Sequence, residues 1–414
     1  MKTKAVIEND FKETEIGLVP EDWQVKGFED CIDKERISRD IKIPQGKYKK
    51  VGRYPIVDQG ASFIAGYTDD KSKLYSGCLP VIVFGDHTRI FKFVDFSFSL
   101  GADGTKLIQP KDFLNPKYFY YCLCSLTIES KGYNRHYKYL KEKFIAFPEK
   151  PEQQKIAFVL SKIQQTIEQQ DRIIETTREL KKSLMNKLFT EGLHGEDQKK
   201  TGIGLLPKSW GATSIGEIAP FQGGFAFKSQ DYHKAGVRLF KIANVSFGKA
   251  IWEDISFLPE EYLTEYDEFI LSEGDIVMAM TRPIVSGGIK VTKLSKTDCP
   301  CLLNQRVGRF QPATMINPDF LYQFLFTENF VNHILYSAGG SQQPNISANK
   351  IEECLIPLPT LSEQKEIADI LSNIDKKIQQ TESRKQTLQS LFKTMLYQLM
   401  TGKVRVKDFD FEVN

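Results

Sequence analysis

The sequence EQQKIAFVLSKI at residues 152–163 decides the fold, because it returns as EQKEIADILSNI at residues 363–374. In both copies apolar residues recur at steps of four and three, which is the period of a coiled-coil seam. Each pattern continues for about 38 residues, a helix of ~57 Å at a rise of about 1.5 Å per residue. A helix this long with one narrow seam needs a partner of equal length, so we predict that the two copies pair as an antiparallel coiled coil.

Polar residues interrupt the predicted seam, among them Gln170 and Lys181 in the first copy and Thr381 and Lys385 in the second. These positions either fix the register of the pair or mark where the helices splay. Two ordinary amphipathic helices, each lying on its own domain, are the alternative, but the length favours a shared coiled coil. The seam residues are Ile156, Leu160, Ile163, Ile167, Ile174, Leu184, Leu188, Ile367, Leu371, Ile374, Ile378, Leu388, Phe392, Met395 and Leu399.

Two further motifs recur in the same order ahead of the long helices. IGLVPEDW at 16–23 returns as IGLLPKSW at 203–210, and NPKYFYYCL at 115–123 returns as NPDFLYQFL at 317–325. The spacing between copies grows along the chain, from 187 residues (16 to 203) to 202 (115 to 317) and then 211 (152 to 363). The chain is therefore interpreted as a tandem duplication of one frame with divergent middles.

The variable regions contain short apolar runs between Gly, Pro and Asp turns, as in YPIV at 54–57, LPVIVF at 79–84 and DIVMAM at 275–280. Such runs indicate strands, and a helix is expected at each N-P-x-aromatic motif. We predict an α/β (α+β) protein: two globular mixed α/β domains separated by two long helices that form an antiparallel coiled coil, with an internal pseudo-two-fold repeat.

At about 150 residues per domain, the 414 residues suggest roughly three folding units. The predicted divisions are 1–150 for the first domain with its N-terminal opening segment, 151–192 for the first long helix, 193–212 for a linker with the repeated I-G-L-x-P motif, 213–360 for the second domain, 361–401 for the second long helix and 402–414 for a short, mobile C-terminal tail.

The composition is that of a globular protein, 41% hydrophobic and 26% charged. No apolar run is long enough to span a membrane and no secretory signal opens the sequence, so we expect no membrane association and a cytoplasmic location. The C-x-C pairs Cys122/Cys124 and Cys299/Cys301 lack partners at zinc-site spacing, so no metal site is predicted. A net charge of +3 means that any nucleic-acid binding must come from local clusters or from a basic partner.

The N-P-x-aromatic motifs approach the N-P-P-aromatic motif of amino-group DNA methyltransferases, with Lys117 and Asp319 in place of the second proline. A structural interpretation explains both copies, because Asn caps a helix and Pro suits its first turn. The sequence contains no glycine-rich loop for a methyl donor and no G-x-x-x-x-G-K-[ST] phosphate loop. We therefore predict no catalytic residues and no cofactor.

A basic, aromatic-rich segment, KGYNRHYKYLKEK at 131–143, is the best candidate for nucleic-acid binding in the first copy. Cations there can neutralise phosphates and rings can contact sugars or bases, although a solvated basic loop explains the segment too. The second copy has amides and hydroxyls instead, which can read adenine edges or simply pack beside the helix start. The candidates are Tyr133, Asn134, Arg135, His136, Tyr137 and Lys138 in the first copy, and Ser341, Gln342, Gln343 and Asn345 in the second.

Loops that follow the apolar strands supply further candidates, because contact residues tend to lie at strand ends. GDHTR at 85–89 and MTRP at 280–283 are such loops, and KYKKVGR at 47–53 is a basic turn suited to phosphates. Arg306 could instead pair with an acid of the core. The candidate DNA contacts are Lys47, Lys49, Lys50, His87, Arg89, Thr281, Arg282, Asn304, Gln305 and Arg306.

This arrangement resembles the specificity subunit of bacterial type I restriction–modification systems. The resemblance is carried by the two I-G-L-x-P motifs and by GDIVMAMTRP, LNQRVGRF, SQQPNIS and IPLPTLSEQKEIADIL in the second copy. YFYY, YNRHYKYL and PEQQKIAFVL occupy the matching places in the first. It covers nearly the whole chain, and YNRHYK in place of QQPNIS suggests a differently built reading surface in the first domain.

The resemblance implies a DNA-recognition subunit whose two target-recognition domains each read half of a bipartite, non-palindromic site in double-stranded DNA. It also implies two modification (methyltransferase) subunits docked on the helices and domains, and restriction subunits with a translocase motor. The methyl donor and ATP would then bind those partners. Two rival hypotheses are a solitary DNA methyltransferase and a coiled-coil scaffold that binds only proteins.

Overall fold

The computed structural model describes residues 11–33, 41–101, 104–130, 132, 134–337, 345–407 and 409. The chain forms two compact units. One comprises residues 1–171 and 383–414, so both chain ends belong to it, and the other comprises residues 172–382. Each unit contains one globular α/β domain and one half of each long helix.

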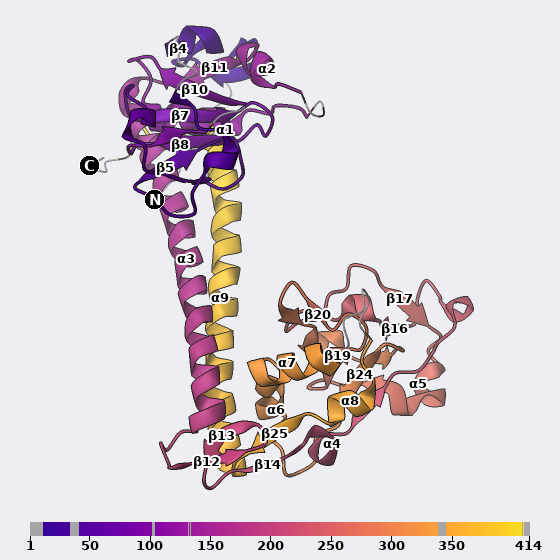
Figure 1. Ribbon diagram of the computed structural model, residues 1–414. Helices are drawn as coiled ribbons and strands as arrows, with labels where there is room; N and C mark the ends of the chain where they lie inside the picture. Colours follow the sequence, from indigo (N-terminus) through magenta and orange to yellow (C-terminus); the bar gives the residue numbers. More distant parts are fainter. Residues whose placement is uncertain are drawn as a thin grey trace. The chain divides into compact units, whose positions relative to one another are not determined.

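The two long helices are α3 (Lys150–Glu191) and α9 (Leu361–Met400), which run antiparallel (Figure 1). In the first unit Leu160 packs in one core with Leu399, and in the second unit Leu188 packs in one core with Leu371. None of the predicted seam residues is exposed. The predicted fold class and coiled coil are confirmed.

Two of the polar seam positions carry cross-helix ion pairs. Lys181 binds Asp375 at 2.7 Å in the second unit, and Lys385 binds Asp171 in the first. Since both lysines reach across to the partner helix, they join the helices and do not mark a splayed region. Gln170 and Thr381, at equivalent places 211 residues apart, are both buried.

In the first domain, the described residues form a four-stranded antiparallel sheet in the order β4-β10-β7-β8 and a second sheet in the order β6-β5-β9. The first sheet consists of β4 (Ile32–Asp33), β10 (Thr105–Pro110), β7 (Val81–Gly85) and β8 (Phe91–Val94). The second consists of β6 (Gly66–Thr68), β5 (Tyr54–Val57) and β9 (Ser99–Leu100), with β5 parallel to β9.

The second domain repeats both strand orders and adds one edge strand to the second sheet, which identifies equivalent elements in the two copies. Its sheets run β15-β24-β19-β22 and β17-β16-β23-β18, and β16 is parallel to β23. The first consists of β15 (Phe221–Gly223), β24 (Val307–Phe310), β19 (Ile276–Ala279) and β22 (Val291–Lys293). The second consists of β17 (Ser256–Leu258), β16 (Val237–Phe240), β23 (Cys301–Leu303) and β18 (Ile270–Leu271).

Shorter elements complete each unit. In the first unit they are the hairpin β1 (Phe11–Thr14) and β2 (Gly17–Pro20), α1 (Pro116–Ser125), α2 (Tyr137–Lys141) and the strand pair β3 (Gln24–Gly27) and β11 (Phe144–Phe147). In the second unit the elements before the sheets are the hairpin β12 (Gln198–Thr201) and β13 (Gly204–Pro207), the strand β14 (Gly211–Ser214) and α4 (Ile215–Ile218). Between the strands of the sheets lie α5 (Tyr262–Glu265) and the hairpin β20 (Ile284–Val285) and β21 (Gly288–Ile289). After the sheets come α6 (Pro318–Phe324), α7 (Glu328–Ser337), α8 (Ala348–Glu352) and β25 (Leu355–Leu358), which pairs with β14. The predicted linker at 193–212 thus contains the hairpin β12–β13.

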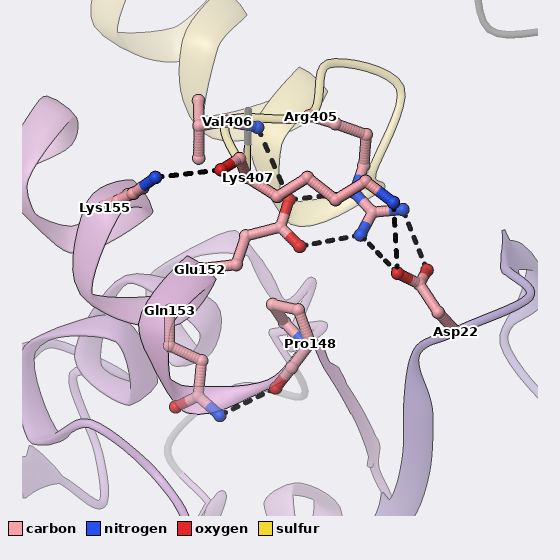
Figure 2. A network of polar contacts seen from close by, with 8 residues as sticks. All are labelled: Asp22, Pro148, Glu152, Gln153, Lys155, Arg405, Val406 and Lys407. Atoms are coloured by element: carbon pink, nitrogen blue, oxygen red, sulfur yellow. Dashed lines mark hydrogen bonds and ion pairs between the residues drawn. The ribbon is translucent and has the colours of Figure 1, made fainter. Parts of the chain in front are cut away.

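The described part of the C-terminal tail is packed, contrary to the mobile tail that we expected. After α9, Gly402 takes a left-handed conformation with φ of 66°, which ends the helix and turns the chain back. Val406 is then buried against the first core. Arg405 binds both Glu152 at the start of α3, at 2.7 Å, and Asp22 at 2.7 Å (Figure 2). The tail therefore closes the first unit.

Candidate DNA interface

In the first domain, the loop that follows β7 is hydrogen-bonded to the segment that precedes α2. The Asp86 carbonyl accepts from the His136 amide at 2.9 Å, and an Asp86 carboxylate oxygen accepts from the Tyr137 amide at 2.7 Å. The His136 Nδ1 atom also lies 3.0 Å from the Asp86 carbonyl oxygen. These bonds bring the candidates of the 85–89 loop beside those of the basic segment.

The second domain joins the equivalent segments in the same way. The Met280 carbonyl accepts from the Ile346 amide at 2.9 Å, and the Met280 amide donates to the Arg306 carbonyl at 2.7 Å. Thr281 and Asn345 form an antiparallel bridge. Candidates from three separate stretches of sequence, Thr281 with its neighbour Arg282, Arg306, and Asn345, therefore gather at one place.

Three of the candidate arginines have a left-handed backbone, with φ of 63° at Arg89, 47° at Arg282 and 66° at Arg306. A side chain other than glycine rarely adopts this region, and such residues concentrate at functional sites. Arg282 and Arg306 are exposed. Arg89 is half-buried, and its Nη1 donates to the Ile128 carbonyl at 2.9 Å.

The candidates differ in how much of each side chain a DNA duplex could reach. His136 is fully buried, and Asn304 is 8% exposed with its Oδ1 accepting from the Gln305 amide at 2.9 Å. A base contact by either would require it to leave these partners, so here they position the backbone. The exposed candidates are Lys47, Lys49, Lys50, Asn134, Arg135, Lys138, Arg282, Gln305, Arg306 and Asn345, and the half-buried ones are His87, Arg89, Tyr137 and Thr281.

Two of these candidates, the exposed Lys49 and the half-buried Tyr137, already have partners within their own domain. Lys49 forms an ion pair of 2.8 Å with Asp69. Tyr137 packs its ring against Phe28 and Phe84, with centroids 6.2 and 6.0 Å away. Tyr133, Ser341, Gln342 and Gln343 lie outside the described residues.

The N-P-x-aromatic motifs are helix starts, as their structural interpretation predicted. Asn115 caps α1 by accepting from the Tyr118 amide at 2.9 Å, and Asn317 caps α6 in the same way. Tyr118 and Phe320, the rings that would stack on an extruded base in a methyltransferase, are fully buried. The Tyr118 hydroxyl donates to the Ala146 carbonyl at 2.9 Å. These rings belong to the two cores, which leaves them no space for a base.

Buried polar side chains position the loops beside the candidate surface, and no sequence pattern predicted them. Lys92 on β8 is 3% exposed and Thr292 on β22 is fully buried. Each directly follows an apolar residue in a short strand, so by alternation a polar residue there looks like a solvent-facing position. The only available signal was that both lie at the same place in the duplicated frame.

The described residues contain no group of three or more His, Cys, Asp or Glu side chains placed to hold a metal ion. Burial raises the pKa of the Cys122 and Cys354 thiols to about 12, so both stay protonated and are poor nucleophiles or ligands at neutral pH. Among the helices of the described chain, none is long and apolar enough to cross a membrane.

Comparison with known proteins gives one consistent result. Residues 20–177 and 207–390 match the family described as type I restriction modification DNA specificity domain. The specificity subunit of the type I restriction enzyme MjaVIII from Methanocaldococcus jannaschii is 33% identical, over 98% of this chain and 98% of its own. The specificity subunit of EcoAI from Escherichia coli is 36% identical over 46% of this chain and 32% of its own.

Two solved structures share the fold at low sequence identity. The S subunit of a type I restriction–modification system from M. genitalium has a TM-score of 0.59 and 18% identity, covering 91% of this chain and 96% of its own. A structure described under complex assembly and conformational transition of the type I R-M system has a TM-score of 0.52 and 15% identity, covering 93% of this chain and 99% of that one.

Proposed function

This chain belongs to the type I restriction modification DNA specificity family, and we propose that it reads a bipartite, asymmetric site in double-stranded DNA, one half-site per domain. The observation that carries the proposal is one sheet topology built twice, with different loops at the equivalent candidate surfaces. After Arg282 the second domain inserts the hairpin β20–β21, whereas the first domain has only the short turn to Arg89. Different surfaces read different sequences, so the two half-sites differ.

The charge distribution supports contact with DNA phosphates by local clusters. Lys47, Lys50, Arg135 and Lys138 are exposed in the first domain, and the first two have no ion-pair partner among the described residues. A phosphate-contacting cation adds affinity without sequence information, while exposed Arg and Asn side chains can read base edges. A net charge of only +3 fits a subunit that shares DNA binding with partners.

The outer faces of the long helices support docking of modification subunits. Leu180 on α3 and Leu391 on α9 are 52% and 44% exposed, and they occupy equivalent places 211 residues apart. Exposed leucines at equivalent places on the two helices offer apolar contacts to another protein. A pair of equivalent leucines fits two identical modification subunits. Restriction subunits with a translocase motor would join that complex in the cytoplasm, and the methyl donor and ATP would bind these partners.

The experiment is a methylome. The chain is co-expressed with its candidate modification subunit in a methylation-free host, and the genome is sequenced for modified bases. A gapped, asymmetric motif that vanishes without this chain is the expected result. A soluble complex that leaves the genome unmodified would contradict the proposal and favour a protein-binding scaffold. Methylation by this chain alone would favour a solitary methyltransferase.

Docking has its own test, with a matched control on the same helix. Leu180→Glu combined with Leu391→Glu should remove co-purification of the modification subunit while the circular dichroism spectrum stays unchanged. Gln389→Glu adds a charge at an exposed position of α9 that does not share a face with Leu391, and it should leave co-purification intact. Full recovery of the complex with the double variant would rule out docking at these leucines.

A further inference from the structure

In each domain a buried polar side chain on a strand hydrogen-bonds to the backbone of a surface loop. We call these two side chains the anchors, and they occupy equivalent positions. The loops are residues 58–65, after β5, and residues 241–250, after β16. Lys92 on β8 pairs with Val83 of β7, and Thr292 on β22 pairs with Val277 of β19. Because β7 and β19 are equivalent central strands, Lys92 and Thr292 take the same place in the two domains.

In the first domain, Lys92 holds its loop at two points, the first residue and the middle. The ammonium group donates to the Asp58 carbonyl at 2.8 Å and to the Ser62 carbonyl at 2.6 Å. The Asp58 carboxylate lies 3.8 Å away and offsets the charge. Burial lowers the pKa of Lys92. A charge is costly to bury, so its presence below a surface loop indicates that the loop conformation matters.

In the second domain, Thr292 does the same with a hydroxyl. Its Oγ1 lies 3.1 Å from the carbonyl oxygens of Ser246 and Lys249, which its single proton can serve one at a time. The same oxygen accepts from the Ser246 amide at 3.3 Å. The Gly248 amide donates to the Val291 carbonyl at 2.9 Å, which ties the loop to β22 a second time.

In both loops the anchored serine is followed by an exposed phenylalanine. Ser62 precedes Phe63, which is 45% exposed, and Ser246 precedes Phe247, which is 51% exposed. Two loops of different length and sequence thus place a phenylalanine directly after the serine whose carbonyl the buried side chain holds. The Phe63 ring packs on one side against Phe96, with centroids 6.0 Å apart, and about half of each phenylalanine stays exposed. A partly exposed ring on an anchored loop in both copies is suited to an apolar contact made on binding.

Both loops lie against the candidate reading segments of their own domain. The Thr88 hydroxyl donates to the Gln59 carbonyl at 2.5 Å, and the His87 amide donates to the Gln59 side chain at 3.2 Å. In the second domain the Phe247 ring lies against Gly288 in the hairpin that follows Arg282, where an added Cβ would be 2.7 Å from the ring. Each phenylalanine therefore borders the surface assigned to DNA.

We propose that Phe63 and Phe247 are specificity-determining residues, and that each reads the C5-methyl group of one thymine in its half-site through the major groove. This inference rests on the proposed function. A phenyl ring has no donor or acceptor, so the base-edge feature it can distinguish is the thymine methyl. Each ring would act beside arginine and amide side chains that read donors and acceptors.

The test uses the full chain in complex with its modification subunit and duplexes carrying the site that the methylome defines. Each thymine of the site is replaced in turn by deoxyuridine, which removes only the methyl group, and kcat/KM for methyl transfer is measured. One thymine in each half-site should lower kcat/KM by about fourfold, the effect of one buried methyl group. If deoxyuridine has no effect anywhere in either half-site, the inference is wrong.

Variants then assign each methyl to a ring. With Phe247→Ala, the sensitive thymine of one half-site should become insensitive while the other half-site keeps its response, and Phe63→Ala should give the reverse. Phe247→Leu keeps an apolar group and should retain part of the response. Met315→Ala, another exposed apolar residue of the second domain at 52%, is the control and should change neither. A response that persists in both alanine variants would overturn the inference.

Failure of the proposed function has a different signature. Wild-type complex that methylates no site overturns both the proposed function and this inference. Wild-type complex that methylates a gapped, asymmetric site without any response to deoxyuridine overturns the inference alone. A minor-groove wedge in place of methyl reading would appear as motif changes in the alanine variants without deoxyuridine sensitivity, and this outcome also counts against the inference.

Discussion

Both long helices begin with a glutamate followed by a glutamine. The partners of these side chains show which contacts the two copies share and which differ. The glutamines behave identically. Gln153 accepts from the Asn115 amide at 2.7 Å and donates to the Pro148 carbonyl at 2.9 Å. Gln364 accepts from the Asn317 amide at 2.7 Å, and it makes the matching bond to the Pro359 carbonyl at 3.0 Å.

The neighbouring glutamates are both buried but have different partners. Glu152 forms a bidentate pair with Arg405 of the C-terminal tail, at 2.8 and 2.7 Å (Figure 2). Glu363 instead accepts from the Trp210 indole at 2.9 Å and from the Leu193 amide at 3.1 Å. A buried carboxylate must have donors, but the frame does not specify which.

The difference makes the first unit dependent on a segment that is distant in sequence. Its helix start is closed by the C-terminal tail, whereas the second is closed by the residues that directly continue α3. Gly192, at the equivalent of Gly402, has the same left-handed φ of 66° and lies against Trp210. The two copies therefore share the left-handed turn after the long helix, whereas a different donor binds the buried glutamate in each.

The largest expected effect comes from breaking the cores where each domain meets the helices. Leu160 and Leu371 are equivalent, fully buried and part of separate cores. Leu160→Asp or Leu371→Asp should each cost about 4 kcal/mol or more, because a charge is buried without a partner. Hydrogen exchange by mass spectrometry should show loss of protection first in the unit that carries the substitution. Unchanged protection and assembly in the double variant would refute the shared coiled coil.

A smaller effect distinguishes the two glutamates. Arg405→Ala leaves Glu152 buried without its cation and should cost about 3–5 kcal/mol in the first unit. Trp210→Phe removes one of two donors to Glu363 and should cost about 1–3 kcal/mol in the second. Amide exchange near the start of each helix gives both free energies. Equal losses would mean that the tail is no more important than an indole hydrogen bond.

The two anchors, Lys92 and Thr292, should also differ in how much stability they give their loops, with the larger contribution in the first domain. Lys92→Met leaves the Asp58 and Ser62 carbonyl groups without this donor and removes the cation that faces the Asp58 carboxylate, and should reduce protection of residues 58–65 by about 1–3 kcal/mol. Thr292→Val is nearly isosteric and should cost residues 241–250 about 1 kcal/mol. Exchange in the unsubstituted loop of each variant serves as the control. A larger loss with Thr292→Val would contradict the assigned contacts.

The smallest effect is an acid dependence confined to the first unit. Hydrogen bonds from Arg405 lower the pKa of Asp22, and the equivalent position in the second copy is Ser209. A lowered pKa contributes stability above the ordinary value of about 4, and this contribution is lost as the pH falls through the folded-state pKa. Asp22→Asn should therefore destabilise the first unit by about 0.5–1 kcal/mol at pH 7. The difference from wild type should vanish below that range, and a difference that grows with acid would reverse the assigned sign.

Sequence patterns predicted the features that depend on neighbours along the chain. The seam of α3 and α9, the capping asparagines Asn115 and Asn317, and the duplicated frame all follow from local spacing. The coiled coil needed one non-local inference, that two helices of equal length pair with each other. Periodicity could supply it because both seams are narrow.

Other features depended on contacts between distant segments, and the sequence could not supply them. Arg405 follows a helix in a short charged tail, which reads as mobile until Glu152 and Asp22 are seen beside it. His136 in a basic segment reads as a DNA contact, although it is buried against Asp86. The same limit hid Lys92, because strand pairing decides which face of β8 is covered.

The most direct test of the account is a methylome after exchange of one domain. Residues 213–356 are replaced by the corresponding region of the MjaVIII relative, which is 33% identical over nearly the full chain, and the chimera is expressed with the same modification subunit. If one frame carries two independent readers, one half-site should change while the other half-site and the spacer length stay as in wild type. Changes in both half-sites would contradict that division of labour.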